Sequence, residues 1–167
     1  ALRADWIETP IGAMVAVAAD EGLLLLEFAE ARTLEGEVER LQPVLHRDIL
    51  PMGSPILQST SNQIQQYFTG RLKSFDLPLK PVGTPFQRSV WDQLLLIPYG
   101  DTTSYADLAR ILKNPNAFRA VGSANGANPI SIIIPCHRVI NTDGKLGGYA
   151  GGLKRKEWLL SHERKNR

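Results

Sequence analysis

The segment with the clearest chemical potential is Pro135-Cys136-His137-Arg138, because it places the chain's only cysteine beside an imidazole and a guanidinium. The thiolate is the nucleophilic form of cysteine, and a nearby base or positive charge favours it. The alternative is a structural cysteine, because free cysteine is among the most buried residue types and a buried thiol is often inert. The flanking proline, histidine and arginine favour the nucleophile.

The residues before the cysteine predict how it is positioned. Ile132, Ile133 and Ile134 are β-branched and predict a buried strand. Pro135 ends that strand, since proline cannot donate to a sheet ladder. Neighbours in an extended chain point to opposite faces, so the spacing alone does not bring His137 against the thiol.

The composition limits the class of protein. The chain has 167 residues of which 43% are hydrophobic, which predicts one domain or two small ones with a buried core. One cysteine makes no internal disulfide and no thiolate zinc site, so we expect a reducing, cytoplasmic location. We also expect no metal and no cofactor. No run of about 18 apolar residues and no signal-peptide pattern is present, so we expect no membrane association. The first residue is not methionine, which suggests a processed chain or a piece of a longer one.

Charge is distributed unevenly along the chain. Residues 1–83 carry 7 Lys and Arg against 11 Asp and Glu, whereas residues 84–167 carry 12 against 6. A basic half attracts a polyanion by neutralising phosphates and releasing counterions. A solvated basic face is the commoner explanation, so the charge only indicates where DNA would bind.

The first half, residues 1–80, predicts an α/β domain with a small antiparallel sheet. Three short strands are expected at 6–8, 13–19 and 23–28, a further one at 46–50, and helices at 33–42 and 54–68. No catalytic constellation occurs there, and we expect the lone His46 to be structural. Pro78 and Pro81 indicate a linker over residues 77–83.

The second half, residues 84–167, predicts a mainly α domain with a helix-turn-helix. Thr84-Pro85 starts a helix with Phe86, Val90 and Leu94 on its inner face, and Ser104 to Asp107 form a capping box for the next. A third helix, residues 117–125, is made mostly of small residues, with Arg119 as its long basic side chain. Such a helix has few groups that read base edges but can approach a narrow groove closely. From the residues alone, Arg119 is more simply a surface ion pair.

Three motifs carry a resemblance to a known family: Asn128-Pro129, Pro135-Cys136-His137-Arg138-Val139, and Gly147-Gly148-Tyr149-Ala150-Gly151-Gly152. Over about residues 84–163 the chain resembles the O6-alkylguanine-DNA alkyltransferases. The resemblance implies a ribonuclease H-like first domain, a winged-helix-like second domain, and irreversible transfer of an alkyl group to the cysteine from O6-alkylguanine, with O4-alkylthymine as a second candidate substrate. The partner implied is double-stranded DNA, bound by a monomer through the minor groove and associated with the nucleoid.

The resemblance also implies residue roles. Cys136 is the methyl acceptor, His137 acts as its base through a water, Glu163 orients the imidazole, and Asn128 is a structural hinge. The groups that would contact the extruded base are Tyr105, Val139, Tyr149 and the Ala150 backbone. The DNA-binding residues are Arg119, which fills the space left by the extruded nucleotide, and the small residues Ala120, Gly122 and Ser123.

Three other interpretations remain open at this point. A cysteine hydrolase would use Cys136, His137 and Glu163 on an acyl substrate, although such enzymes usually take cysteine and histidine from distant parts of the chain. A non-catalytic binder of alkylated DNA would need no reactive cysteine. The chain could also be the repair domain of a larger adaptive-response transcriptional activator.

Overall fold

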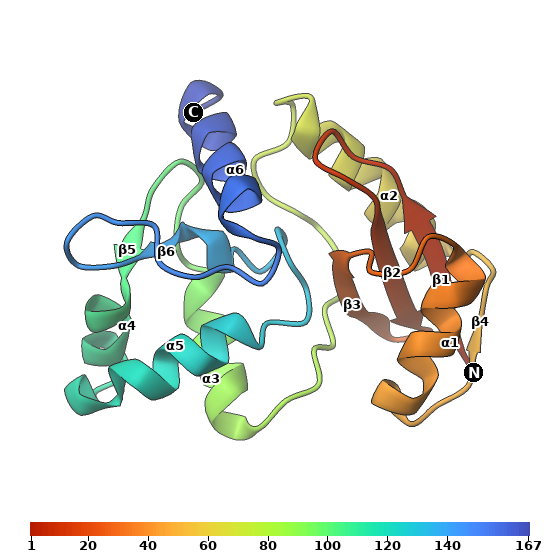
Figure 1. The fold of residues 1–167 in the computed structure, drawn as a ribbon, viewed down its shortest axis with the longest axis horizontal. Coiled ribbons are helices and arrows are strands. Elements are labelled where there is room, and N and C mark those ends of the chain that lie inside the picture. The colour runs from red at the N-terminus through yellow and green to blue at the C-terminus, as the bar shows by residue number, and fades with distance from the viewer. The chain divides into compact units, whose positions relative to one another are not determined.

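The first structural unit is built on a sheet whose strands follow the apolar runs of the sequence. In this computed structural model, which describes residues 1–167, strands β1 (Leu2–Ile7), β2 (Met14–Ala19) and β3 (Gly22–Phe28) form an antiparallel meander (Figure 1). β1 starts earlier than predicted because Leu2 and Ala4 are core residues with no exposed surface. The short β4 (Ile49–Leu50) pairs with β1 in parallel, so the sheet is mixed rather than purely antiparallel.

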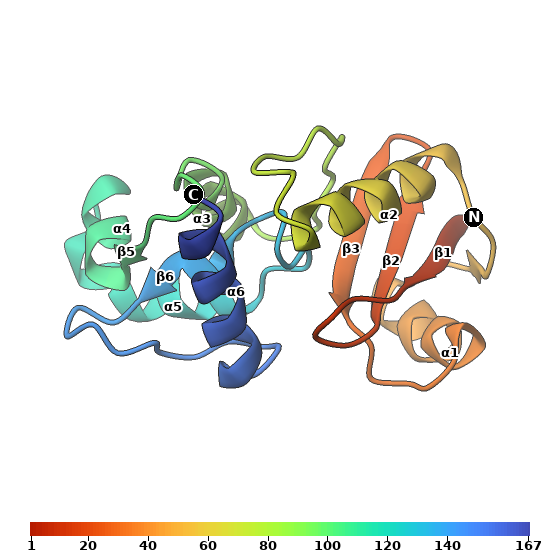
Figure 2. The ribbon, with the colours of Figure 1, turned by 90° about the horizontal axis from the view of Figure 1, so that it is seen from above.

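Two helices cover this sheet. Figure 2 shows α1 (Leu34–Leu45) and α2 (Pro55–Phe68) on opposite faces. The side chains of Thr33 and Ser54 accept hydrogen bonds from backbone N–H groups in the first turns of these helices, and so satisfy donors that lack an intrahelical partner. Leu41 of α1 packs in the core of the sheet with Leu2 and Val17.

His46 ends α1 in the left-handed conformation, with a φ of 53°. Its backbone N–H donates to Gln42 O, which satisfies one of the last carbonyls of the helix. His46 therefore has a structural role at the end of this helix.

The second unit, Val82–Arg167, is mainly helical, whereas the first comprises Ala1–Pro81. Its elements are α3 (Pro85–Leu94), α4 (Tyr105–Ile111), α5 (Phe118–Gly126), α6 (Leu153–Lys165) and a parallel pair of two-residue strands, β5 (Thr103–Ser104) and β6 (Val139–Ile140). Thr84 and Gln87 form the capping box of α3, and Ser104 caps α4. The inner face of α3 differs from the prediction at one position: Phe86 is 36% exposed, while Val90, Trp91 and Leu94 are buried.

The predicted strand over Ile132–Ile134 is wrong. These residues are buried but form consecutive turns, Ile132 has a φ of 72°, and Cys136–Arg138 is a 3₁₀ turn. The cause is Asn128, whose Oδ1 accepts from Ile130 N at 3.0 Å and whose Nδ2 donates to Ile134 O at 2.8 Å. These local bonds replace a sheet ladder and fold the segment back on itself.

Candidate active site

A buried histidine and a buried glutamate form the centre of the candidate site. His137 Nε2 lies 2.7 Å from Glu163 Oε2, and both residues are at most 1% exposed. Burial raises the pKa of Glu163, but hydrogen bonds and charges from His137 and then Arg138 outweigh it and hold that pKa well below its usual range. Burial also lowers the pKa of His137, although Glu163 opposes this. An ionised carboxylate therefore faces a neutral imidazole, which must donate its Nε2–H.

This tautomer leaves Nδ1 of His137 with an unshared electron pair. Nδ1 is buried and has no hydrogen-bond partner in the protein. Because α6 supplies the carboxylate and the 3₁₀ turn supplies both His137 and the preceding Cys136, the free nitrogen belongs to the residue next to the thiol. The arrangement can take up one proton at Nδ1 while Glu163 stabilises the resulting imidazolium.

Arg138 has a different position from the one expected. Its Nε donates to Glu163 Oε1 at 2.7 Å, its Nη2 to Glu163 Oε2 at 3.1 Å, and its Nη1 to Ile97 O at 2.7 Å. The guanidinium is thus turned to Glu163 rather than to the sulfur. It keeps the carboxylate ionised and oriented toward His137.

The surroundings of Cys136 favour the protonated form of its thiol. Cys136 is 6% exposed, and burial raises the pKa of its thiol, against opposing effects of Asn128, Lys156 and its own backbone N–H. His137 and Arg138, which were expected to favour the thiolate, are not among the groups that lower this pKa, and the Arg138 guanidinium is paired with Glu163. A nucleophilic reaction at this sulfur needs a base at the moment of reaction.

Lys156 is a site residue that the sequence analysis did not identify. It has no exposed surface, and its Nζ donates to Val139 O at 2.6 Å and to Gly148 O at 3.1 Å. Burial lowers the pKa of Lys156 to about 8, with the Cys136 thiolate opposing the shift. Lys156 thereby joins β6 to the glycine-rich loop and brings a positive charge toward the cysteine. Its spacing from Leu159, Leu160 and Glu163, which form one helical stripe, is the signal that could have identified it.

Two tyrosines lie near the thiol. Burial raises the pKa of Tyr105 and of Tyr149, and the Cys136 charge adds to both shifts. A Cβ built on Gly147 would lie 3.3 Å from the Tyr105 hydroxyl and ring, so glycine at this position allows the loop to approach Tyr105 closely. Val139 is fully buried, and Ala150 is exposed on the same loop.

α5 contributes on both of its faces. Inward, Asn125 Nδ2 donates to Cys136 O at 3.3 Å, a contact that the sequence did not indicate. Outward, Arg119, Ala120 and Ser123 are exposed, and Gly122 is half-buried. Phe118, at the start of the helix, is 50% exposed, so this face is less bare than its small residues suggest.

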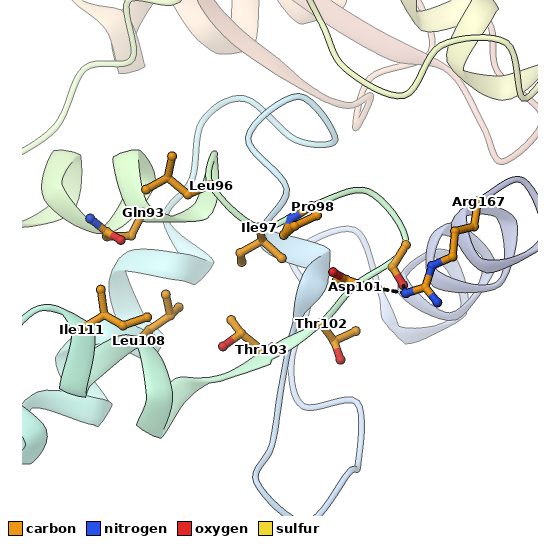
Figure 3. A pocket seen from close by; sticks show the side chains of 11 residues that line it. Gln93, Leu96, Ile97, Pro98, Asp101, Thr102, Thr103, Leu108, Ile111 and Arg167 are labelled. Atoms are coloured by element: carbon orange, nitrogen blue, oxygen red, sulfur yellow. Dashed lines mark hydrogen bonds and ion pairs between the residues drawn. The ribbon is translucent and has the colours of Figure 1, made fainter.

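A cavity of about 520 Å³ lies elsewhere in the second unit, and Figure 3 shows the side chains that line it. Leu96 and Ile111 contribute apolar walls, and Arg167 forms an ion pair with Asp101 beside it. Cys136, His137 and Glu163 do not line this cavity, so it lies outside the candidate site.

Other classes of site have little support in the structure. No group of three or more His, Cys, Asp or Glu side chains is arranged to hold a metal ion. None of the helices has the length and apolar character that crossing a membrane would require.

Comparison with known proteins covers both structural units. Residues 85–165 match the DNA-binding domain of 6-O-methylguanine DNA methyltransferase, and residues 2–81 match its ribonuclease-like domain. A methylated-DNA–protein-cysteine methyltransferase from Methanosarcina barkeri is 45% identical over 162 residues, which is 97% of each chain.

Solved structures give the same result. The crystal structure of Mycobacterium tuberculosis O6-methylguanine methyltransferase matches with a TM-score of 0.84 and 39% identity, covering 100% of this chain and 95% of that one. A structure of the M. tuberculosis protein in complex with DNA matches with a TM-score of 0.83 and 40% identity, covering 98% and 94%.

Proposed function

The chain belongs to the 6-O-methylguanine DNA methyltransferase family, and we propose that Cys136 is the residue that accepts the alkyl group. The protein is a methylated-DNA–protein-cysteine methyltransferase, which repairs DNA by direct transfer of an alkyl group from O6 of guanine to a protein cysteine. The assignment to Cys136 is supported by the geometry of the next residue. His137 Nε2 lies 2.7 Å from Glu163 Oε2, and its Nδ1 is free to accept a proton.

The proposed reaction is a displacement at the alkyl carbon. The proton of the Cys136 thiol passes through one water to Nδ1 of His137, and the thiolate attacks the alkyl carbon. The new S–C bond forms as the C–O6 bond breaks, and the bonding electrons remain on guanine. The guanine anion then takes up one proton, which balances the proton lost by the thiol. Glu163 stabilises the imidazolium in between.

The residues around the thiol would hold the base. A tyrosine hydroxyl is protonated at neutral pH and burial raises the pKa of Tyr105 further, so this hydroxyl can donate to the guanine ring. The Ala150 backbone N–H would face O6, with Val139 and Tyr149 as apolar walls. Asn128 would act as a hinge, because its hydrogen bonds to Ile130 and Ile134 hold the chain between α5 and the cysteine.

The DNA would be bound by α5. We infer that α4 and α5 act as a helix-turn-helix with α5 in the minor groove, where Ala120, Gly122 and Ser123 allow close approach to the backbone. The alkylated base lies inside the duplex stack, so it must be flipped out before it reaches a buried thiol. Arg119, exposed on the same helix, would fill the space that the base leaves.

The proposed mechanism consumes the protein. A thioether has no good leaving group, and no second thiol is present to remove the alkyl group. We therefore propose a single turnover by a monomer that needs no cofactor, acts on O6-alkylguanine in duplex DNA, and works in the reducing cytoplasm, on nucleoid DNA.

Peptide mapping after reaction with a duplex containing O6-methylguanine tests this assignment. We expect one methyl group on the peptide that contains Cys136, and none in Cys136→Ser, a variant that should still bind DNA. A methyl group on any other residue, or an unmodified wild-type protein, would refute the proposed role.

A further inference from the structure

A second cavity of about 540 Å³ lies between α5 and the loop after β6. Its volume is in the range of small-ligand sites, which is roughly 300–1,000 Å³. Its lining includes two aromatic side chains, two polar side chains and two glycines: Tyr105, Phe118, Asn141, Thr142, Gly122 and Gly148. No step of the proposed reaction explains why a phenylalanine lines it.

Phe118 lines this cavity and belongs to α5, the helix proposed to bind DNA. It is the first residue of α5 and is 50% exposed. Phe118 and Gly122 are four residues apart, so they share a helix face, and both line the cavity. Arg119 is rotated from Phe118 by about 100° around the helix axis, so the two side chains project in different directions.

The cavity connects with the acceptor site through Tyr105. Its ring lies between Gly122, which lines the cavity, and Gly147 of the glycine-rich loop: a Cβ on Gly122 would be 3.8 Å from Tyr105 Cδ1, and one on Gly147 would be 3.3 Å from Tyr105 Cε2. The same tyrosine is close enough to Cys136 for the thiolate charge to raise the pKa of its hydroxyl. Tyr105 is therefore a residue that the cavity shares with the acceptor site.

The chemistry of the walls fits one component of DNA, the extruded nucleotide. The ring of Phe118 offers an apolar surface to the C–H face of a deoxyribose or to a base, as aromatic residues do in proteins that bind single strands. The Asn141 amide and the Thr142 hydroxyl line the same cavity and can donate hydrogen bonds to a phosphate.

We propose that Phe118 is a substrate-binding residue that packs against the sugar of the extruded nucleotide and holds it outside the duplex. This inference rests on the proposed function, since it requires a flipped nucleotide. Phe118 and Arg119 then have complementary roles, because Arg119 replaces the lost base in the stack and Phe118 retains the nucleotide that has left it.

Three substrates separate these roles: a duplex and a single strand, each carrying O6-methylguanine, and free O6-benzylguanine. Single-turnover transfer to Cys136 is measured for each. Phe118→Ala should be about ten-fold slower on both the duplex and the single strand, because both present the sugar. Its rate on the free base should not change. Phe118→Tyr keeps the ring and should stay within about two-fold of wild type on all three.

The matched control is Phe86→Ala, which removes another exposed phenylalanine of the same unit that does not line the cavity. It should leave all three rates unchanged. A Phe118→Ala defect confined to the duplex would make Phe118 a second wedge and overturn the proposal. An equal loss of rate on all three substrates would show that Phe118→Ala damages the fold. An unchanged rate on all three would show that Phe118 does not contact the nucleotide. Either result also overturns the proposal. If wild type transfers nothing to Cys136, it is the proposed function that has failed.

Discussion

The carboxylate of Glu163 lies 2.7 Å from Nε2 of His137, although 26 residues separate them in the sequence. Arg138 donates to the same carboxylate at 2.7 and 3.1 Å and so keeps it ionised. The buried His137–Glu163 pair favours the tautomer in which Nδ1 is free to accept a proton. In the proposed mechanism, activation of Cys136 depends on this acceptor, since burial raises the pKa of the thiol.

Glu163→Gln should slow transfer to Cys136 by about 10²–10⁴-fold, because general-base assistance depends on the oriented, stabilised imidazole. DNA affinity should change little, since Glu163 is buried and does not face solvent. Single-turnover kinetics and a mobility-shift assay measure the two properties. Glu157→Gln, an exposed position on the same helix, is the control and should react like wild type. Equal rates for the two variants would remove Glu163 from the mechanism.

The free energy of unfolding should fall as pH drops below about 6.5, the ordinary pKa of histidine. The pKa of His137 is lowered in the folded protein, so the unfolded state takes up a proton that the native state does not. Glu163 acts in the same direction at lower pH: its folded pKa is depressed, so its contribution is present above about 4.3 and is lost as pH falls.

Urea unfolding at a series of pH values measures this dependence. His137→Gln should flatten the part between about pH 7 and 5.5. His46→Asn removes an exposed histidine, suits the left-handed backbone there, and should leave the curve unchanged. A dependence between about pH 7 and 5.5 that persists in His137→Gln would contradict the assignment.

Lys156→Met should slow transfer and shift the reactivity of the thiol to higher pH. The substitution removes the two hydrogen bonds that Lys156 donates to the carbonyl oxygens of Val139 and Gly148. It also removes a positive charge that lowers the pKa of Cys136. The pH profile of Cys136 alkylation by a small electrophile measures the second effect. Lys154→Met, exposed two residues earlier, should keep the wild-type profile. A slower variant with an unshifted profile would limit Lys156 to holding the loop.

Arg119→Ala should slow repair of duplex DNA sharply and leave the reaction with free O6-benzylguanine almost unchanged. The reason is that only duplex repair must offset an unstacking cost of a few kcal/mol. Arg119→Lys should restore activity only in part, because an ammonium lacks the planar surface of a guanidinium. Full rescue by lysine, with added salt reproducing the alanine defect, would instead indicate a phosphate contact.

Local patterns predicted most of the fold. Thr84-Pro85 and Ser104 marked helix starts because capping depends on residues three positions apart, and the structure places caps at both. The three apolar runs of the first unit form strands, as their composition and the turn residues between them predicted. The family resemblance supplied Glu163, whose distance from His137 in sequence no local pattern could bridge.

The features that the sequence did not predict depend on the direction in which particular side chains point. Ile132 to Ile134 have strand propensity, but the hydrogen bonds of Asn128 outweigh it. Arg138 follows the cysteine by two residues, yet its partner is 25 residues further on, so its charge serves Glu163. Phe118 lies in a segment made mostly of small residues, and nothing in the sequence indicated that its side chain lines a cavity.

The most direct test of irreversible transfer to Cys136 is the number of methyl groups that one protein molecule accepts. Wild-type protein is incubated with a large excess of O6-methylguanine duplex, and methyl groups on protein and repaired guanine are counted over time. We expect both to reach a plateau at one per protein, with all label on Cys136. Repaired guanine that continues to accumulate beyond one per protein would contradict irreversible transfer to this thiol.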